Sequence, residues 1–267
     1  IGAKNFGDIY VEGKRYRSRR EWRGVVDTLY DYSRWLYNWI NMFRIVLVKP
    51  RNIKAMFRYR WMANYLAVPM MVDRHTQGLR GEHLRICHAE QDVIIEDVAK
   101  LLDKLFRGDR RIGNDEEFSK KVVLVDENEM QSVMMGFPTV VPLSREIAST
   151  YIPVLLNQRA AIHYIDVAQE YGLAGDVCPM PEAEAGVSID DDAPILGCCA
   201  VQCNTTCDGS LLSNGVISKR MEFEDGIPVF QLASPLRHMN EDVQEYAAQE
   251  TRNAIAFIEE QTGEKWD

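Results

Sequence analysis

The pattern of apolar positions divides the chain near residue 120. From about Arg19 to Tyr65, apolar and aromatic residues recur at the spacing of a helix, and Lys49-Pro50 interrupts the run because the residue before a proline avoids the helical region. This pattern predicts two aromatic-rich amphipathic helices packed on the rest of the protein. A further helix is predicted over residues 82–106, with Gly108 beyond its end.

After residue 120 the pattern consists of short apolar runs separated by turn residues and helical stretches. Strands are predicted over residues 122–125, 195–201 and 228–232, and helices over 143–156, 160–171 and 241–262. Residues 182–194 are expected to form an acidic connection. Strands that alternate with helices favour an α/β fold with a mainly parallel sheet. We therefore expect two parts, a mainly helical, basic N-terminal region (1–120) and an α/β domain (121–267).

Composition and charge narrow the class of protein. The 267 residues are 46% hydrophobic and 27% charged, which is typical of a globular protein, and six cysteines are too few for a disulfide-rich scaffold. Residues 1–60 hold 14 Lys/Arg against 5 Asp/Glu, a net charge of +9. Since the whole chain has a net charge of −9, residues 61–267 carry −18. The acidic majority would repel a polyanion, which argues against nucleic-acid binding.

The sequence contains no pattern typical of a membrane span or a secretion signal. The most apolar stretch, Trp35 to Val48, has 14 residues and includes two asparagines and an arginine, whereas a span needs about 20 largely apolar residues. The first residues lack the charged and apolar regions of a signal peptide. We expect a cytoplasmic protein whose thiols are reduced.

Five of the six cysteines fall within thirty residues, namely Cys178, Cys198, Cys199, Cys203 and Cys207. Grouped thiols are soft ligands, suited to zinc, copper(I) or an iron–sulfur cluster, yet the CxxC pairs of zinc ribbons are absent from the sequence. Cys198 and Cys199 fit a predicted strand as small core residues. Cys203 and Cys207 are expected in the loop after that strand, where open α/β sheets bind ligands.

Four segments in the second part carry a resemblance to a known family. They are Ala168–Gly172 leading to Asp176–Cys178 and Gly186, then Asn204–Asp208, then Gly226–Leu232 followed by Ser234-Pro235, and last Phe257–Gly263. In this order and at these intervals, residues 163–267 resemble the iron–sulfur subunits of 2-hydroxyacyl-CoA dehydratases, a superfamily shared with benzoyl-CoA reductases. The fold implied is a Rossmann-like or flavodoxin-like domain.

The resemblance implies a [4Fe-4S] cluster held by three cysteines. Cys178 matches the first ligand and Cys207, which is followed by Asp208, matches the second. The third ligand is expected from a second α/β domain after Asp267, so we expect the chain to be incomplete. The family also implies three partners: a second, related subunit in a heterodimer, an ATP-hydrolysing iron–sulfur activator, and an acyl-CoA substrate.

The active-site entrance of the family resembles Gly136–Pro142, followed by Glu146. A hydroxyl residue there is associated with the substrate in the family, which makes Thr139 a candidate catalytic residue, and Glu146 is the second candidate because it matches the glutamate that follows the proline. Three residues separate Pro142 from Glu146, so the spacing departs from the usual Pro-x-Glu. The alternative is a turn followed by a helix that Ser144 or a neighbour caps.

By this resemblance the chain is expected to be a subunit of an oxygen-sensitive lyase of anaerobic metabolism. Such enzymes remove water from a 2-hydroxyacyl-CoA through a ketyl radical, after one electron has been added to the thioester. Two alternatives stay open. One is a benzoyl-CoA reductase-type subunit that reduces an aromatic acyl-CoA, and the other is a non-catalytic α/β fragment that binds zinc or no metal.

Overall fold

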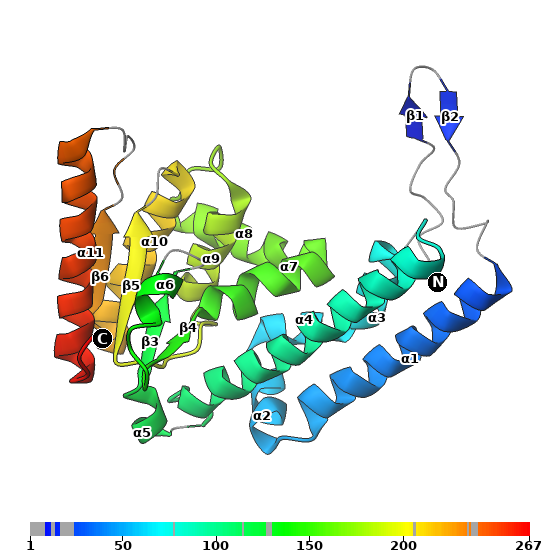
Figure 1. Ribbon diagram of the computed structural model, residues 1–267, viewed down its shortest axis with the longest axis horizontal. Coiled ribbons are helices and arrows are strands. Elements are labelled where there is room, and N and C mark those ends of the chain that lie inside the picture. Colours follow the sequence, from blue (N-terminus) through cyan, green and yellow to red (C-terminus); the bar gives the residue numbers. More distant parts are fainter. Residues whose placement is uncertain are drawn as a thin grey trace.

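The structure is a computed structural model in which an arm of helices extends from a layered α/β part (Figure 1). It describes residues 9–11, 14–16, 24–76, 78–113, 115–126, 130–204, 207–233, 235 and 240–267. Of the segments that carry the family resemblance, Thr205, Thr206 and Ser234 lie outside the described residues. Strands β1 (Ile9–Val11) and β2 (Lys14–Tyr16) form a short antiparallel hairpin.

The predicted helical N-terminal region is confirmed. The arm consists of α1 (Val25–Leu47), α2 (Pro50–Arg58), η2 (Arg60–Ala67), α3 (Val68–His75) and α4 (Gly81–Gly108). Lys49 has extended dihedral angles (φ −105°, ψ 122°) and Pro50 begins α2, as expected for a proline whose missing N–H is not needed in the first turn. Among the described helices, none combines the length and the apolar character that a membrane crossing requires.

A four-stranded, all-parallel sheet forms the centre of the second part, which confirms the predicted α/β class. The strand order is β4-β3-β5-β6, with β3 at Val122–Val125, β4 at Val141–Leu143, β5 at Cys199–Asn204 and β6 at Val229–Ala233. Because the strands are parallel, all their carboxyl ends meet at one edge and all their amino ends at the other.

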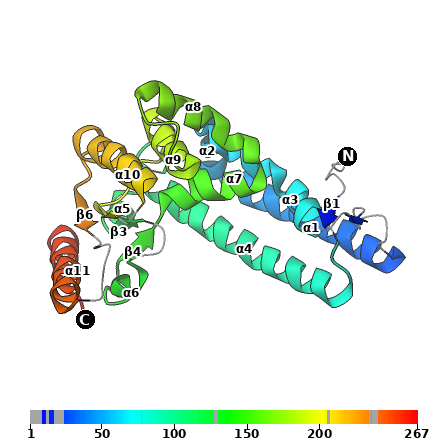
Figure 2. The same ribbon diagram turned by 90° about the horizontal axis from the view of Figure 1, so that it is seen from above.

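Helices cover both faces of this sheet (Figure 2). One face carries α6 (Gln131–Met134) and α11 (Glu241–Thr262), and the other carries α7 (Ile152–Leu156), α8 (Ile162–Tyr171), α9 (Pro179–Ile189) and α10 (Asp208–Arg220). Shorter helical segments are α5 (Glu116–Ser119), η3 (Ile147–Tyr151), η4 (Gln158–Ala161) and η5 (Met221–Asp225). Helices α8 and α11 end at Tyr171 and Thr262, the ends predicted for them, and each is followed by a left-handed glycine, Gly172 (φ 113°) and Gly263 (φ 74°).

Two predicted elements are wrong. The strand expected over 195–201 begins four residues later, because Gly197 (φ 99°) turns the chain first. Cys203 is therefore in β5, 1% exposed, and not in the following loop. The acidic connection expected over 182–194 is mostly helix α9, with Glu182 2% and Glu184 8% exposed. Helix α9 is buried on nearly all sides, so its sequence lacks the polar face that marks a surface helix.

Residues 141–156 also differ from prediction. The expected helix over 143–156 is preceded by strand β4, and the helix begins only after Ser144. Pro142 is tolerated in β4 because β4 is an edge strand. The Oγ of Ser144 accepts a hydrogen bond from the N–H of Ile147 at 3.3 Å. Ser144 thus bonds the first turn of this helix, as the alternative interpretation predicts, although a strand and not a turn precedes it.

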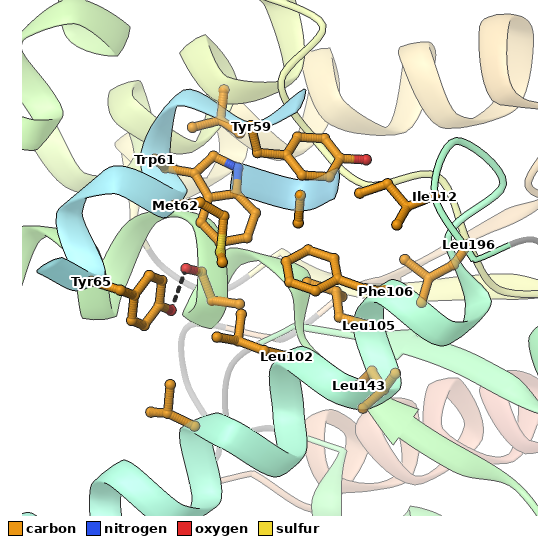
Figure 3. Packing of buried hydrophobic residues seen from close by; sticks show 14 of the residues in the cluster. Tyr59, Trp61, Met62, Tyr65, Leu102, Leu105, Phe106, Ile112, Leu143 and Leu196 are labelled. Atoms are coloured by element: carbon orange, nitrogen blue, oxygen red, sulfur yellow. Dashed lines mark hydrogen bonds between the residues drawn. The ribbon is translucent and has the colours of Figure 1, made fainter. Parts of the chain in front are cut away.

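One apolar core joins the arm to the α/β part. Tyr59, Trp61 and Phe106 stack with ring centroids 5.5–6.0 Å apart, and the same cluster extends to Leu143 of β4 and Leu196 before β5 (Figure 3). Both parts contribute side chains to this single buried cluster. The division into two domains, residues 1–120 and 121–267, therefore stays a prediction.

The carboxylate of Asp192 makes a buried polar connection between the two parts. It accepts hydrogen bonds from the backbone N–H of Arg60 at 3.0 Å and from the hydroxyl of Tyr164 at 2.5 Å. The indole N–H of Trp61 donates to the backbone oxygen of Asp192 at 2.9 Å. Burial raises the pKa of Asp192 above its ordinary value, and the hydrogen bond from Tyr164 opposes that rise.

Helix α1 places its apolar stripe on the solvent side, which differs from the predicted packing. Side chains exposed by 38–76% are Val25, Val26, Leu29, Tyr32, Trp35, Leu36, Tyr37, Ile40 and Phe43. The opposite face packs against the arm and is partly polar: Asn38 and Asn41 are buried, and Asp31 pairs with His88 at 3.3 Å. An apolar surface of this extent is typical of an interaction site.

We predict that Gly186→Ala destabilises the protein. A Cβ at this position would lie 1.9 Å from the backbone oxygen of Tyr164, so α8 and α9 would have to separate. Overpacking typically costs about 1–3 kcal/mol and occasionally more, and a contact with rigid backbone belongs to the upper end of that range. The matched control is Gly215→Ala in α10, where a Cβ meets open space and should stabilise the helix by about 0.5–1 kcal/mol. Denaturant unfolding measures both free energies, and equal effects of the two variants would contradict the close packing.

We predict that Asp192→Ala lowers the free energy of unfolding by about 2–5 kcal/mol, because it leaves the buried donors of Arg60 and Tyr164 without their acceptor. The control is Asp191→Asn, because the Asp191 side chain is 60% exposed in its pair with Arg111 and Asn tolerates its positive φ of 57°. Exposed pairs contribute about 0–1 kcal/mol. A loss for Asp192→Ala no greater than that of the control would contradict the role of this carboxylate.

Candidate functional site

The two cysteines predicted as ligands each immediately precede a helix. Cys178 is exposed and stands at the residue before α9, followed by Pro179. Cys207 is half-buried and stands at the residue before α10. The unpaired N–H groups of a helix's first turn, together with its dipole, favour negative charge at this position. Both cysteines therefore stand at helix N-termini.

Gly209 brings the two helix starts together. A Cβ at Gly209 would lie 3.4 Å from the Cβ of Cys178 and 3.2 Å from the Cγ of Pro181. Since Gly209 is buried and stands two residues after Cys207, the first turns of α9 and α10 are in direct contact. We call this place, formed by Cys178, Cys207 and Gly209, the cysteine corner. It lies beyond the carboxyl end of β5, where α/β sheets bind ligands.

The surroundings of Cys207 stabilise its thiolate. The backbone N–H and then the hydroxyl of Ser210 lower the pKa of Cys207, with a smaller contribution from the N–H of Gly209, whereas Asp208 acts in the opposite direction. A lowered thiol pKa is typical of cysteines at helix N-termini and increases the fraction of protein available as a soft, anionic ligand at neutral pH.

A buried carboxylate near this corner was missed from the sequence. Glu182 lies in the first turns of α9 and is 2% exposed; one of its oxygens accepts a hydrogen bond from the side-chain amide of Gln169 at 3.2 Å. Its other oxygen has no hydrogen-bond partner among the described residues. The sequence offered little signal for it, because a glutamate between alanines and prolines is equally typical of an acidic loop.

The described residues contain no group of three or more His, Cys, Asp or Glu side chains placed to hold a metal ion together. The cysteine corner thus offers two thiol ligands. The other three clustered cysteines lie along β5 or just before it: Cys203 is in the strand, and Cys198 and Cys199 stand at its amino end.

Thr139 lies at the opposite edge of the sheet from the cysteine corner. It is exposed and precedes β4, so it stands at the amino ends of the strands. Its backbone N–H donates to Glu264 at 2.8 Å, and its hydroxyl donates to the same carboxylate. Together with Lys120 and Lys121 it borders an open pocket of about 430 Å³. The structure does not bring Thr139 together with the two cysteines.

Glu146, by contrast, lies on the carboxyl side of the sheet. Its carboxylate pairs with the Nε of Arg145 at 2.9 Å, and the Arg145 side chain is 3% exposed. Glu146 also borders a cavity of about 10 Å³ together with Asp126 and Asn214, which is room for about one water molecule. Of the two predicted catalytic residues, Glu146 is the one on the same side of the sheet as the cysteine corner.

Comparison with known proteins gives a family match for the second part of the chain. Residues 139–267 match the family model described as 2-hydroxyglutaryl-CoA dehydratase, D-component. A comparison with curated proteins finds no match. The matched residues include β4, β5 and β6, both residues of the predicted catalytic pair and the whole cysteine corner. From Thr139 onward, the chain is therefore similar to the 2-hydroxyglutaryl-CoA dehydratase D-component family.

Proposed function

We propose that this chain is a subunit of an oxygen-sensitive 2-hydroxyacyl-CoA dehydratase, a lyase, and that it holds part of a [4Fe-4S] cluster. The family match supports the coarser statement, a component of a dehydratase system. The observation that carries the finer proposal is the cysteine corner, where the contact at Gly209 joins the starts of two helices that each follow a cysteine.

The chemistry of the corner fits an iron–sulfur cluster in part. Cysteine thiolates are the usual ligands of such clusters, and the two helix N-termini offset the negative charge that thiolates and sulfides bring. Cys178 and Cys207 would supply two ligands. A third ligand must then come from outside the described residues, since these contain no larger group of ligands.

When bound, such a cluster would supply one electron to the thioester and an iron site able to bind oxygen. The chain's own contribution is to hold the two cysteine ligands, and the amides and hydroxyl beside Cys207 favour the thiolate form of that residue. We propose that the remaining parts of the system are a second, related subunit, an ATP-hydrolysing iron–sulfur activator and the acyl-CoA substrate, in the cytoplasm. The exposed stripe of α1 is an apolar surface available to such a subunit.

The first alternative is a benzoyl-CoA reductase-type subunit, whose substrate is an aromatic thioester. It would use the same cysteine corner, so the described geometry favours neither substrate. The second alternative is a non-catalytic α/β fragment that binds no metal, or that binds zinc through the same two thiols, since zinc also accepts thiolate ligands. Metal content and substrate choice distinguish the three.

We predict that the full chain, prepared without oxygen, contains iron and acid-labile sulfide and absorbs in the visible range. Cys178→Ala and Cys207→Ala should each lose most of the bound iron, because each removes one of only two thiols at the corner. Cys87→Ala is the matched control, since Cys87 lies in α4 of the arm. Colourless protein with stoichiometric zinc that neither corner variant alters would contradict the cluster.

Substrate choice then separates the two enzymes. With the activator and the partner subunit added, turnover of a 2-hydroxyacyl-CoA without turnover of benzoyl-CoA supports the dehydratase. The opposite preference would replace it with the reductase.

We propose Thr139 and Glu146 as residues that contact the substrate in the assembled enzyme. In that complex, Thr139→Val should lower kcat/KM about tenfold or more, which corresponds to the loss of one good hydrogen bond of about 1.4 kcal/mol. Thr139→Ser keeps the hydroxyl and should keep kcat/KM near the wild-type value. Glu264→Gln is the control, because it weakens the bond that Thr139 makes within the chain and keeps the hydroxyl. Glu146→Gln should also lower kcat/KM. Values unchanged in Thr139→Val or Glu146→Gln would remove that residue from the site.

A further inference from the structure

Cys198 and Cys199 are neighbours in sequence whose sulfur atoms lie 3.9 Å apart. Both are free thiols, Cys198 half-buried and Cys199 completely buried. They stand at the amino end of β5, the opposite end of the strand from the cysteine corner. The proposed function makes no use of them.

The close approach of these thiols is unusual for adjacent residues at a strand. Successive side chains of a strand point to opposite faces of the sheet. Here the chain turns at Gly197 (φ 99°), whose N–H donates to the hydroxyl of Ser119 at 2.9 Å. The Sγ of Cys198 approaches the backbone oxygen of Val122 at 3.2 Å. As a result, Cys198 packs against the same apolar cluster that contains Cys199.

The two thiols differ in a way that suits a reaction in two steps. The contact with the Cys199 thiol lowers the pKa of Cys198. The same contact, together with burial, raises the pKa of Cys199. The half-buried Cys198 is thus the sulfur able to ionise and to meet a small reagent, and the buried Cys199 is the neighbour placed to react next. Redox-active cysteines have this combination of a reactive thiol and a nearby resolving thiol.

We propose that Cys198 and Cys199 form a redox-active pair that reduces a small hydroperoxide and closes to a disulfide. The Cys198 thiolate attacks the terminal peroxide oxygen, the O–O bond breaks, and the alcohol or water leaves after taking up a proton. Cys198 is then a sulfenic acid. The Cys199 sulfur attacks the Cys198 sulfur, an S–S bond forms, and water leaves. In total the dithiol is oxidised by two electrons and the peroxide is reduced to the alcohol and water.

The disulfide formed is expected to be easy to reduce. Neighbouring Cα atoms are about 3.8 Å apart, whereas those of ordinary disulfides are about 4.4–6.8 Å apart. A strained disulfide has a high reduction potential and reacts readily with thiols. The pair is therefore expected to cycle, with low-molecular-weight thiols as the reductant, and not to remain as a structural crosslink.

The test uses the full chain, reduced and then treated with one equivalent of hydrogen peroxide. Mass spectrometry should show the loss of two hydrogen atoms, peptide mapping should place the bond between Cys198 and Cys199, and dithiothreitol should reverse it. In Cys199→Ser, dimedone should trap a sulfenic acid on Cys198. Cys198→Ser should block both products, and Cys87→Ser should behave as the wild type does.

Two readouts keep the test independent of folding and of the cluster. Reduced wild-type protein should bind phenylarsine oxide, a reagent for paired thiols, Cys199→Ser should bind one equivalent less, and Cys87→Ser should bind as much as the wild type does. Far-UV circular dichroism compares the folds of the variants. Oxidation that stops at a sulfinic acid on Cys198, or a disulfide that joins only Cys178 and Cys207, would overturn the proposal. Neither result would bear on whether the cysteine corner binds a cluster.

Discussion

The carboxylate of Asp192 is the constraint on which the position of the cysteine corner depends. It lies three residues beyond the end of α9 and accepts hydrogen bonds from Arg60 of the arm and Tyr164 of α8. Midway along α9, Gly186 lies against the backbone of α8. At the start of α9, Cys178 lies against Gly209 of α10. One helix, fixed at its end and its middle, thus sets where the first cysteine stands.

The same contacts explain how a basic segment and an acidic remainder coexist in one chain. Arg58 and Arg60 of the arm meet the consecutive carboxylates of Asp190, Asp191 and Asp192. The buried carboxylates of Asp109 and Asp192 accept hydrogen bonds from neutral groups in addition to lying near arginine side chains. Burial raises the pKa of Asp109 as it does that of Asp192, and a tyrosine hydroxyl donates to each. The charge separation along the sequence is therefore partly an intramolecular pairing.

Elements with clear local signals were predictable from the sequence, and those defined by tertiary burial were not. Gly172 and Gly263 end helices where only a left-handed residue fits, and these ends were expected. Helix α9 was mistaken for a loop because burial on nearly all sides removes periodicity from its sequence. Motif resemblance selected Cys178 and Cys207, but it gave no sign that Gly209 joins them, since this contact arises only when two helices pack.

Strand β5 connects the two thiol pairs and also keeps them separate. Its six residues span roughly 20 Å, far beyond the reach of direct disulfide exchange between the pair at its amino end and the corner beyond its carboxyl end. The strand is central and hydrogen-bonded on both sides, to β3 and β6, so a distortion at Cys199 is resisted by two neighbours. Oxidation of the pair and occupancy of the corner should consequently be independent, which makes each of them measurable while the other is held constant.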